Sequence, residues 1–229
     1  MKGLIVNGSP RGRKSNSKIM SDFFEQGLVA AGVETESIYL SETRLEFCRG
    51  CLACLKGKQG RCVIDDEMNL FLDKYSAADW VVFTSPVYYY TMPAMLKNFI
   101  ERLLPLSTYQ VYRHETGAFY HENRYLKQPK IALLANCGFP GEGNFEGIKV
   151  AFTFLDPLIT ICRNQGELLK ISKNPARKIV ADYGKLLKKA GRELVRTGAL
   201  SADLQQKLTV SLMCDDAYAN GINTREIPI

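Results

Sequence analysis

Four of the seven cysteines in this 229-residue chain lie within fifteen residues of one another. Cys48, Cys51 and Cys54 follow at spacings of three, and seven residues separate Cys54 from Cys62. Thiolates spaced in this way can converge on one centre, and a [4Fe-4S] cluster takes one external thiolate for each iron. Zinc also accepts four thiolates, although structural zinc sites usually have two C-x-x-C pairs that lie further apart. A redox dithiol and simply buried, uncoordinated cysteines are the remaining alternatives.

A polar loop near the N-terminus carries a second set of groups with binding chemistry. Residues 8–17, the serine loop, read Gly-Ser-Pro-Arg-Gly-Arg-Lys-Ser-Asn-Ser, and Arg11, Arg13 and Lys14 supply positive charge. The loop follows an apolar run and precedes a predicted helix, so backbone amides, hydroxyl groups and the helix dipole point toward one place. The pattern matches neither a P-loop nor the dinucleotide fingerprint. It predicts a phosphate site, and the alternative is a solvated polar loop.

Two further loops follow apolar runs. Residues 85–92, the tyrosine loop, contain three adjacent tyrosines, Tyr88 to Tyr90, of which at least one must be exposed. Exposed rings at the end of a central strand suit a flat, amphipathic ligand, and a subunit interface is the alternative. Residues 136–144, the glycine loop, contain three glycines and a proline that shape a tight turn with exposed amides. Asn144 is predicted to cap the helix that starts at residue 145.

Composition restricts the class of protein. The chain is 46% hydrophobic and 24% charged, as in an ordinary globular domain, and its net charge of +6 favours anionic ligands without indicating nucleic acid. No apolar run is long enough to span a bilayer, and the first residues lack a secretory signal. We expect a cytoplasmic protein without membrane or nucleic-acid partners. Seven cysteines in a reducing compartment favour thiol, metal or redox chemistry over disulfides.

Apolar runs that alternate with helical patterns predict a single α/β domain over residues 1–229. Strands are predicted at 4–6, 33–40, 80–84, 131–135 and 166–171, with a hairpin insertion at 106–129 and a helical C-terminal extension at 200–229. The expected fold is a flavodoxin-like, doubly wound, five-stranded parallel sheet of order 2-1-3-4-5, with the three loops around one crevice. A crevice with an anion site at one end and aromatic rings at the other suits FMN. The cysteine segment follows strand two, so a cluster there could exchange electrons with the flavin, in the same subunit or across an interface.

Three motifs in order carry a family resemblance: residues 8–11 with 15–17, residues 85–90 with Met92-Pro93, and residues 137–140 with 144–146. Over roughly residues 1–150 the chain resembles the NADPH-dependent FMN reductase family, and with the cysteine run it resembles the iron-sulfur flavoprotein branch. The resemblance implies that the FMN phosphate is held by Ser9, Arg11, Ser15, Asn16 and Ser17. It implies that the ring and ribityl chain are lined by Pro86, Val87, Tyr88, Tyr89, Tyr90, Met92, Asn136, Cys137, Gly138 and Phe139. It assigns the cluster ligands to Cys48, Cys51, Cys54 and Cys62, and it implies a homodimer or tetramer.

The resulting hypothesis is a flavoprotein oxidoreductase that passes electrons from NAD(P)H through FMN to a quinone, a flavin or another small acceptor, with the cluster as a relay. Hydride transfer demands no acid or base, so no catalytic side chain is assigned. One alternative is an electron carrier reduced by a ferredoxin-type protein partner. The other is a zinc-bearing, nucleotide-binding module without redox activity.

Overall fold

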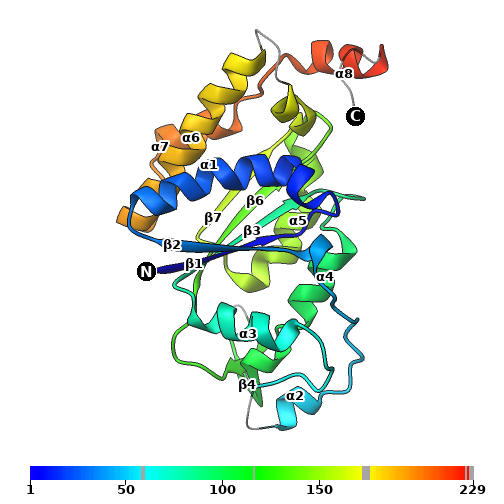
Figure 1. Cartoon of the computed structure of the whole chain (residues 1–229), viewed down its shortest axis with the longest axis vertical. Helices are drawn as coiled ribbons and strands as arrows, with labels where there is room; N and C mark the ends of the chain where they lie inside the picture. The colour runs from blue at the N-terminus through cyan, green and yellow to red at the C-terminus, as the bar shows by residue number, and fades with distance from the viewer. Residues whose placement is uncertain (58–59, 116, 172–175, 225, 227–229) are drawn as a thin grey trace.

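A five-stranded parallel sheet forms the centre of the molecule (Figure 1). The computed structural model describes all residues except 58–59, 116, 172–175, 225 and 227–229. The strand order is β2-β1-β3-β6-β7, and every neighbouring pair is parallel. The strands are β1 (Lys2–Asn7), β2 (Glu34–Tyr39), β3 (Trp80–Pro86), β6 (Lys130–Asn136) and β7 (Ile159–Arg163). Strands β4 and β5 lie outside this sheet, so the five strands of the sheet, numbered along the chain, have the order 2-1-3-4-5. The predicted fold and strand order are confirmed.

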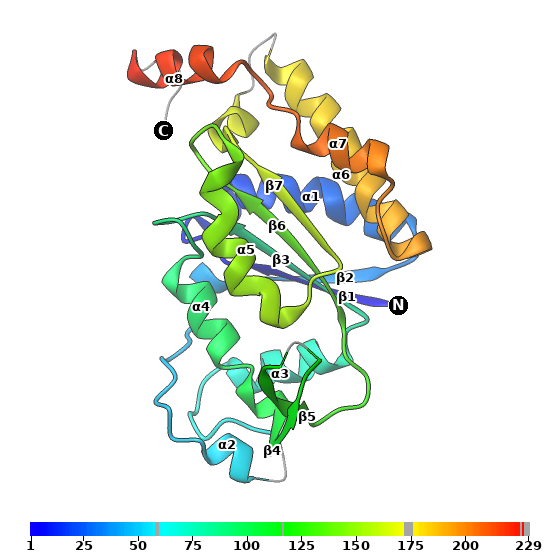
Figure 2. The ribbon, with the colours of Figure 1, turned by 180° about the vertical axis from the view of Figure 1, so that it is seen from behind.

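Alternating side chains divide the core into two layers. Val81 and Phe83 of β3 pack on one face of the sheet, while Trp80 and Val82 pack on the other. All four are buried, as expected for a central strand that is covered on both faces. The first face is covered by α3 (Met68–Ala77), α4 (Ala94–Glu101) and α5 (Glu146–Phe152), and the second by α1 (Asn16–Ala30), α6 (Ala176–Thr197) and α7 (Ala202–Thr209) (Figure 2).

Helices α1 and α6 cross at a contact that requires glycine. A Cβ added to Gly27 would lie 2.1 Å from the carbonyl oxygen of Lys188, and one on Gly191 would lie 2.3 Å from the carbonyl oxygen of Phe24. Such distances are well inside van der Waals contact, so both glycines allow the two backbones to touch. This close crossing seals the second face of the sheet.

The fifth strand lies earlier than the sequence analysis predicted. Strand β7 spans Ile159–Arg163, and Gly166–Lys170 forms a 3₁₀ helix. The prediction of a strand at 166–171 was wrong. Leu168 and Leu169 are buried, as strand residues would be, but they lie in a 3₁₀ turn beyond the end of the sheet. Gln165 reverses the chain there with a φ of +54°.

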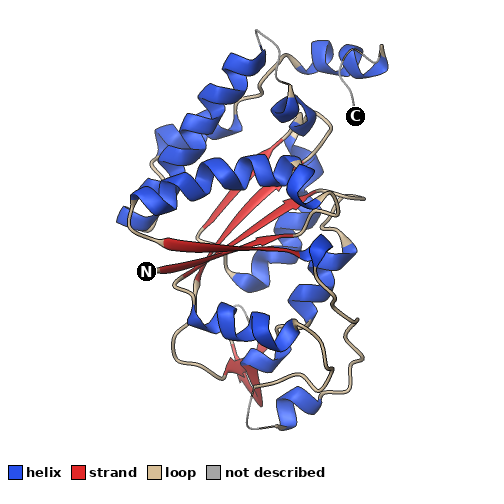
Figure 3. Cartoon of the chain, in the orientation of Figure 1, coloured by secondary structure: helices blue, strands red, loops and turns tan. Residues whose placement is uncertain are grey.

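The insertion and the C-terminal extension complete the molecule (Figure 3). The predicted hairpin is confirmed as β4 (Ser107–Arg113) paired antiparallel with β5 (Phe119–Asn123). The extension contains two helices, α7 and α8 (Asp215–Asn223). The short elements are α2 (Ala53–Lys56) and 3₁₀ helices at Gly12–Lys14, Leu40–Glu42, Leu104–Leu106, Glu142–Phe145 and Thr153–Leu155. Among the described residues, no helix has both the length and the apolar character to cross a membrane.

Candidate functional site

The three loops meet at the carboxyl ends of β1, β3 and β6. The Asn136 side chain donates from Nδ2 to Ser17 Oγ at 2.7 Å, which joins the glycine loop to the serine loop. The backbone N–H of Val87 donates to the carbonyl oxygen of Asn136 at 2.7 Å, which joins the tyrosine loop to the same residue. The Thr84 hydroxyl donates to the carbonyl oxygen of Ser17 at 2.9 Å. Asn136 is therefore bonded to both other loops.

The serine loop forms a buried hydroxyl and amide cradle at the start of α1. Ser15 is the N-cap of this helix, and its Oγ accepts from the backbone N–H of Lys18 at 3.0 Å. Ser9, Ser15, Asn16 and Ser17 are all buried. Asn16 Oδ1 is buried and has no hydrogen-bond partner among the described residues. Since buried polar atoms are nearly always paired, this side chain marks a place where a polar ligand group fits.

Two of the predicted cations lie outside this cradle. The exposed Arg11 side chain reaches Glu167 Oε1 at 3.4 Å. Arg13 pairs with Glu42 at 2.9 Å and stacks 4.2 Å above the ring of Tyr39, so it braces the edge of the sheet rather than the loop interior. Buried hydroxyl groups and helix amides, not a cluster of cations, thus define the interior of the loop.

The tyrosine loop ends in a strained turn. Tyr88 and Thr91 exchange two backbone hydrogen bonds of 2.8 and 3.2 Å. The central residues Tyr89 and Tyr90 have φ values of +48° and +67°, the pattern of a type I′ turn that normally uses glycine or asparagine. Each such residue costs about 1–3 kcal/mol, and strain of this kind gathers at functional sites. Tyr89 is 95% exposed and Tyr90 67%, so both rings are available to a ligand or partner. In contrast, Met92 is buried in the core.

Helix α5, which follows the glycine loop, packs against this turn. Gly147, in the first turns of α5, lies so close to the turn that an added Cβ would be 2.2 Å from the carbonyl oxygen of Tyr90. Cys137 is buried, and burial raises the pKa of its thiol. Phe139 is exposed. Asn144 does not cap a helix as predicted, because its Nδ2 donates to the carbonyl oxygens of Pro140 and Gly141 and closes the loop on itself.

The four clustered cysteines line one pocket of about 30 Å³. Burial, and then the neighbouring Cys62 and Cys51, raise the pKa of Cys54, so these thiols influence one another. Cys48 and Cys51 are exposed. Within the part of the chain that the structure describes, no three His, Cys, Asp or Glu side chains lie close enough together to hold a metal ion. The thiols therefore surround one pocket without forming a finished coordination site.

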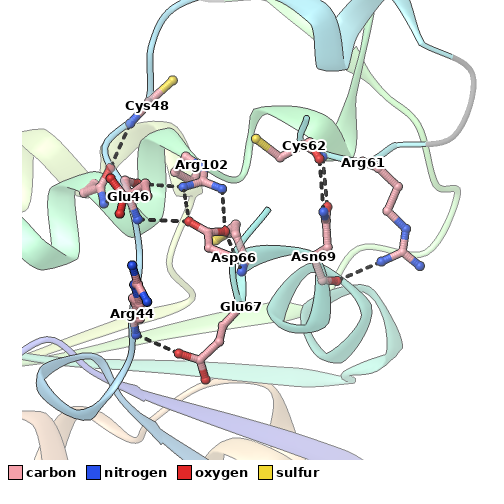
Figure 4. A network of polar contacts seen from close by, with 11 residues as sticks. Arg44, Glu46, Cys48, Arg61, Cys62, Asp66, Glu67, Asn69 and Arg102 are labelled. Carbon is pink, nitrogen blue, oxygen red and sulfur yellow. Dashed lines mark hydrogen bonds and ion pairs between the residues drawn. The ribbon is translucent and has the colours of Figure 1, made fainter. Parts of the chain in front are cut away.

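A buried ion pair fixes the loop that leads to Cys48 (Figure 4). Arg102 binds Asp66 through two hydrogen bonds of 2.8 Å, and both side chains are almost fully buried. The pair also fixes Glu46, whose carbonyl oxygen accepts from Arg102 at 2.6 Å and whose N–H donates to Asp66 at 2.9 Å. Asp66 accepts in addition from the backbone N–H of Met68, the first residue of α3, at 3.0 Å.

Two asparagines hold the cysteines themselves. Asn98 accepts from the backbone N–H of Cys48 at 3.2 Å. Asn69 accepts from the N–H of Cys62 at 2.9 Å and donates to its carbonyl oxygen at 3.0 Å (Figure 4). These contacts of Asn69, Asn98, Arg102 and Asp66 were not predicted from the sequence. Their signal in the sequence is that Asn98 and Arg102 are four residues apart, a spacing that places them on one face at the end of α4.

The cysteine pocket lies away from the three loops. Its lining includes Glu101 and Arg102 at the C-terminal end of α4, whereas the tyrosine loop leads into the N-terminal end of that helix. Eight helical residues rise about 12 Å. Figures 1 and 2 show α2, which carries Cys54, at the far end of the molecule from the tips of β1 and β3. The segment leaves the sheet after the carboxyl end of β2, and its polar contacts to α4 and Arg102 then lead it away from the crevice.

The profile of a family described as NADPH-dependent FMN reductase matches residues 1–122, more than half of the chain. The chain belongs to the NADPH-dependent FMN reductase family. An iron-sulfur flavoprotein of Archaeoglobus fulgidus is 29% identical over 214 residues, which cover 80% of this chain and 96% of that protein. An iron-sulfur flavoprotein of Methanosarcina thermophila is 35% identical over 102 residues, which cover 44% of this chain and 52% of that protein. The chain thus spans nearly all of the first relative and about half of the second.

Solved structures of a quinone oxidoreductase and of an FMN-dependent azoreductase share the fold. An NAD(P)H:quinone oxidoreductase from Methanothermobacter marburgensis aligns with a TM-score of 0.59 at 20% identity, over 85% of this chain and 96% of the other. An FMN-dependent NADH-azoreductase from Bacillus anthracis, solved with FMN, aligns with a TM-score of 0.60 at 17% identity, over 85% and 99%. At these identities the likeness establishes the fold. It agrees with the flavodoxin-like sheet found in this member of the FMN reductase family.

The residues present fit the cofactor of the FMN reductase family. The buried hydroxyl groups of the serine loop and the amides at the N-terminus of α1 suit a phosphate group, and the unpartnered Asn16 Oδ1, an acceptor, suits a hydroxyl group of the same ligand. The exposed tyrosines suit an isoalloxazine ring. For a cluster, the cysteines fit in type and number. Their pocket of about 30 Å³ has room for about one water molecule, so the cysteine segment would have to rearrange around such a group.

Proposed function

We propose that this protein is an FMN-dependent oxidoreductase that takes electrons from NAD(P)H and delivers them to a quinone, a flavin or another small acceptor. The observation that carries the proposal is the meeting of a buried hydroxyl cradle and exposed tyrosines at one sheet edge, with Asn136 bonded to both loops. This polarity matches a ligand with one phosphate and one flat ring system. Membership of the NADPH-dependent FMN reductase family supports the same function.

FMN, when bound, supplies a carrier that accepts a hydride and passes electrons on. The residues of this chain bind and orient it. The hydroxyl groups of Ser9 and Ser17 and Nδ2 of Asn16 would donate hydrogen bonds to the phosphate beside the N-terminus of α1, where the helix dipole favours negative charge. Ser15, whose hydroxyl donates to the carbonyl oxygen of Gly12 at 2.6 Å, would hold the loop around the phosphate. Residues 137–139 of the glycine loop would close the other side of the ring. Tyr89 and Tyr90 would cover the ring and limit the access of water.

The test separates phosphate recognition from ring recognition. Wild-type protein should bind FMN more tightly than riboflavin, since only FMN carries the phosphate. An Asn16→Asp variant places a carboxylate beside the phosphate, so we expect the dissociation constant for FMN to rise about 100-fold while that for riboflavin changes little. The FMN-loaded protein should oxidise NADH or NADPH with a quinone or free flavin. Failure to bind FMN, or to oxidise either nucleotide with any acceptor, would refute the proposal.

We further propose that Cys48, Cys51, Cys54 and Cys62 hold a cluster, with the names of the curated relatives as support. Iron and sulfide counts, with a visible spectrum recorded under anaerobic conditions, test this. Cys51→Ser should lose iron, whereas Cys214→Ser, at an exposed cysteine of the extension, should keep it. Equal iron contents in the two variants would exclude the assignment.

A second candidate function is an electron carrier that a ferredoxin-type partner reduces. The exposure of Cys48 and Cys51 favours it, because a group held there would be accessible to another protein. The length of α4 separates this pocket from the tyrosine loop, so transfer to the flavin favours an oligomer in which one subunit's pocket faces another subunit's flavin. Direct oxidation of NAD(P)H, as opposed to reduction only by ferredoxin, distinguishes the two functions. Sedimentation measurements would test the predicted dimer or tetramer.

A further inference from the structure

The backbone of the glycine loop is fixed by the residues that follow β7. The N–H of Cys137 donates to the carbonyl oxygen of Arg163 at 2.9 Å, and the carbonyl oxygen of Cys137 accepts from the N–H of Gly166 at 2.8 Å. The carbonyl oxygen of Phe139 accepts from the N–H of Gln165 at 3.3 Å. Any movement of residues 163–166 would therefore move the loop.

The same residues bind the C-terminal extension. Arg163 is completely buried and donates to the carbonyl oxygens of Val210 at 2.9 Å and Thr209 at 3.3 Å. Asn164 is also buried, and its Nδ2 donates to Ser211 Oγ at 3.3 Å. These bonds attach the segment that links α7 to α8 to the carboxyl end of the sheet.

Gln165 uses its whole side-chain amide on the extension. Its Nε2 donates to the carbonyl oxygen of Met213 at 2.9 Å and to Asp215 Oδ1 at 2.8 Å. Its Oε1 accepts from the backbone N–H of Met213 at 3.0 Å. A buried glutamine with a left-handed backbone is unusual, and here that conformation lets the side chain and the backbone bind two different segments.

Tyr218 of α8 closes the connection by contacting the glycine loop directly. Its hydroxyl donates to the carbonyl oxygen of Gly138 at 2.6 Å, and the residue is 1% exposed. The ring packs with Leu168, and Ile171, Leu212, Met213 and Ile222 pack against this pair. Burial raises the pKa of Tyr218 to about 12, so the hydroxyl keeps its proton and remains a donor at neutral pH. Figure 2 shows α8 on the same side of the molecule as the end of β7.

We propose that the C-terminal segment 209–218 sets the position of the glycine loop for flavin binding, with Tyr218 as the positioning residue. The segment touches no part of the serine loop or the tyrosine turn through the contacts described above, so its action is confined to residues 137–139. The inference rests on the proposed function only for the identity of the ligand. The mechanical connection between extension and loop stands independently of it.

The experiment compares two full-length variants that each lose one buried hydroxyl group. Tyr218→Phe removes the donor to Gly138 and keeps the ring. Tyr183→Phe is the matched control, because Tyr183 is also buried and its hydroxyl has no hydrogen-bond partner among the described residues. Hydrogen exchange is measured on the flavin-free proteins at the amides of residues 137–139 and 141. FMN affinity is then measured by quenching of flavin fluorescence.

We expect exchange in the glycine loop to become about fivefold faster in Tyr218→Phe, because a factor of about five corresponds to the loss of one ordinary hydrogen bond. Exchange should stay unchanged in Tyr183→Phe. The dissociation constant for FMN should rise by a similar factor in Tyr218→Phe alone, with unchanged exchange in α1. Equal loop exchange in the two variants would overturn the connection. Faster exchange with unchanged FMN affinity would overturn its role in flavin binding. If the wild-type protein binds no FMN, the proposed function fails, while the exchange comparison still decides the connection.

Discussion

Substituting Gly147 should weaken FMN binding without touching any residue assigned to the cofactor. The missing Cβ of Gly147 would lie 2.2 Å from the carbonyl oxygen of Tyr90, so in Gly147→Ala the new Cβ and this oxygen must move apart to at least 3.0 Å. The tyrosine turn is strained already, because Tyr89 and Tyr90 have positive φ values. A displaced Tyr90 carbonyl therefore lets the turn relax to a conformation that these residues prefer.

We expect Gly147→Ala to raise the dissociation constant for FMN about tenfold and to lower the free energy of unfolding by about 1–3 kcal/mol, as for other overpacked contacts. Flavin-fluorescence titration and urea unfolding measure the two quantities. Gly143→Ala is the control, since a Cβ there meets nothing within 4 Å and the residue lies only four positions before Gly147. If Gly147→Ala bound FMN as tightly as Gly143→Ala, the argument that α5 positions the tyrosine turn would be refuted.

Three further predictions concern the frame around the sites. Arg102→Met leaves Asp66 buried without its partner, so urea unfolding should show a loss of about 3–5 kcal/mol. Burial opposes ionisation of Asp66, but hydrogen bonds from Arg102 and two backbone N–H groups outweigh it and lower the pKa of Asp66. The stabilising contribution of Asp66 is therefore complete above about pH 4 and is lost as pH falls through the lowered pKa. Asp66→Asn should make the free energy of unfolding depend less on pH in this acid range, and an unchanged pH dependence would contradict the assignment. Gly27→Ala should lower the free energy of unfolding by at least about 1–3 kcal/mol and leave α1 and α6 further apart, and a melting temperature equal to that of wild type would show that the crossing tolerates a Cβ.

Most of the sheet and the three loops could be predicted from local patterns. The apolar run at residues 80–84 is buried on both faces because helices pack on each side of a parallel sheet, and alternation of side chains follows from strand geometry. Loops after parallel strands must emerge at one edge, so the serine, tyrosine and glycine loops come together whatever their detailed contacts. The fifth strand was the exception, since a buried 3₁₀ turn at 166–170 has a similar apolar composition.

The sequence alone determined the fold, the order of the loops and the kinds of groups that each loop offers, because these depend on residues close together in the chain. Only the tertiary structure decided where the cysteines lie, since Cys48 is held by Asn98, fifty residues away. The same holds for the contact between Tyr218 and Gly138, which are eighty residues apart. Partners of this kind are chosen by packing and by the need to pair buried polar groups, and no local pattern encodes that choice.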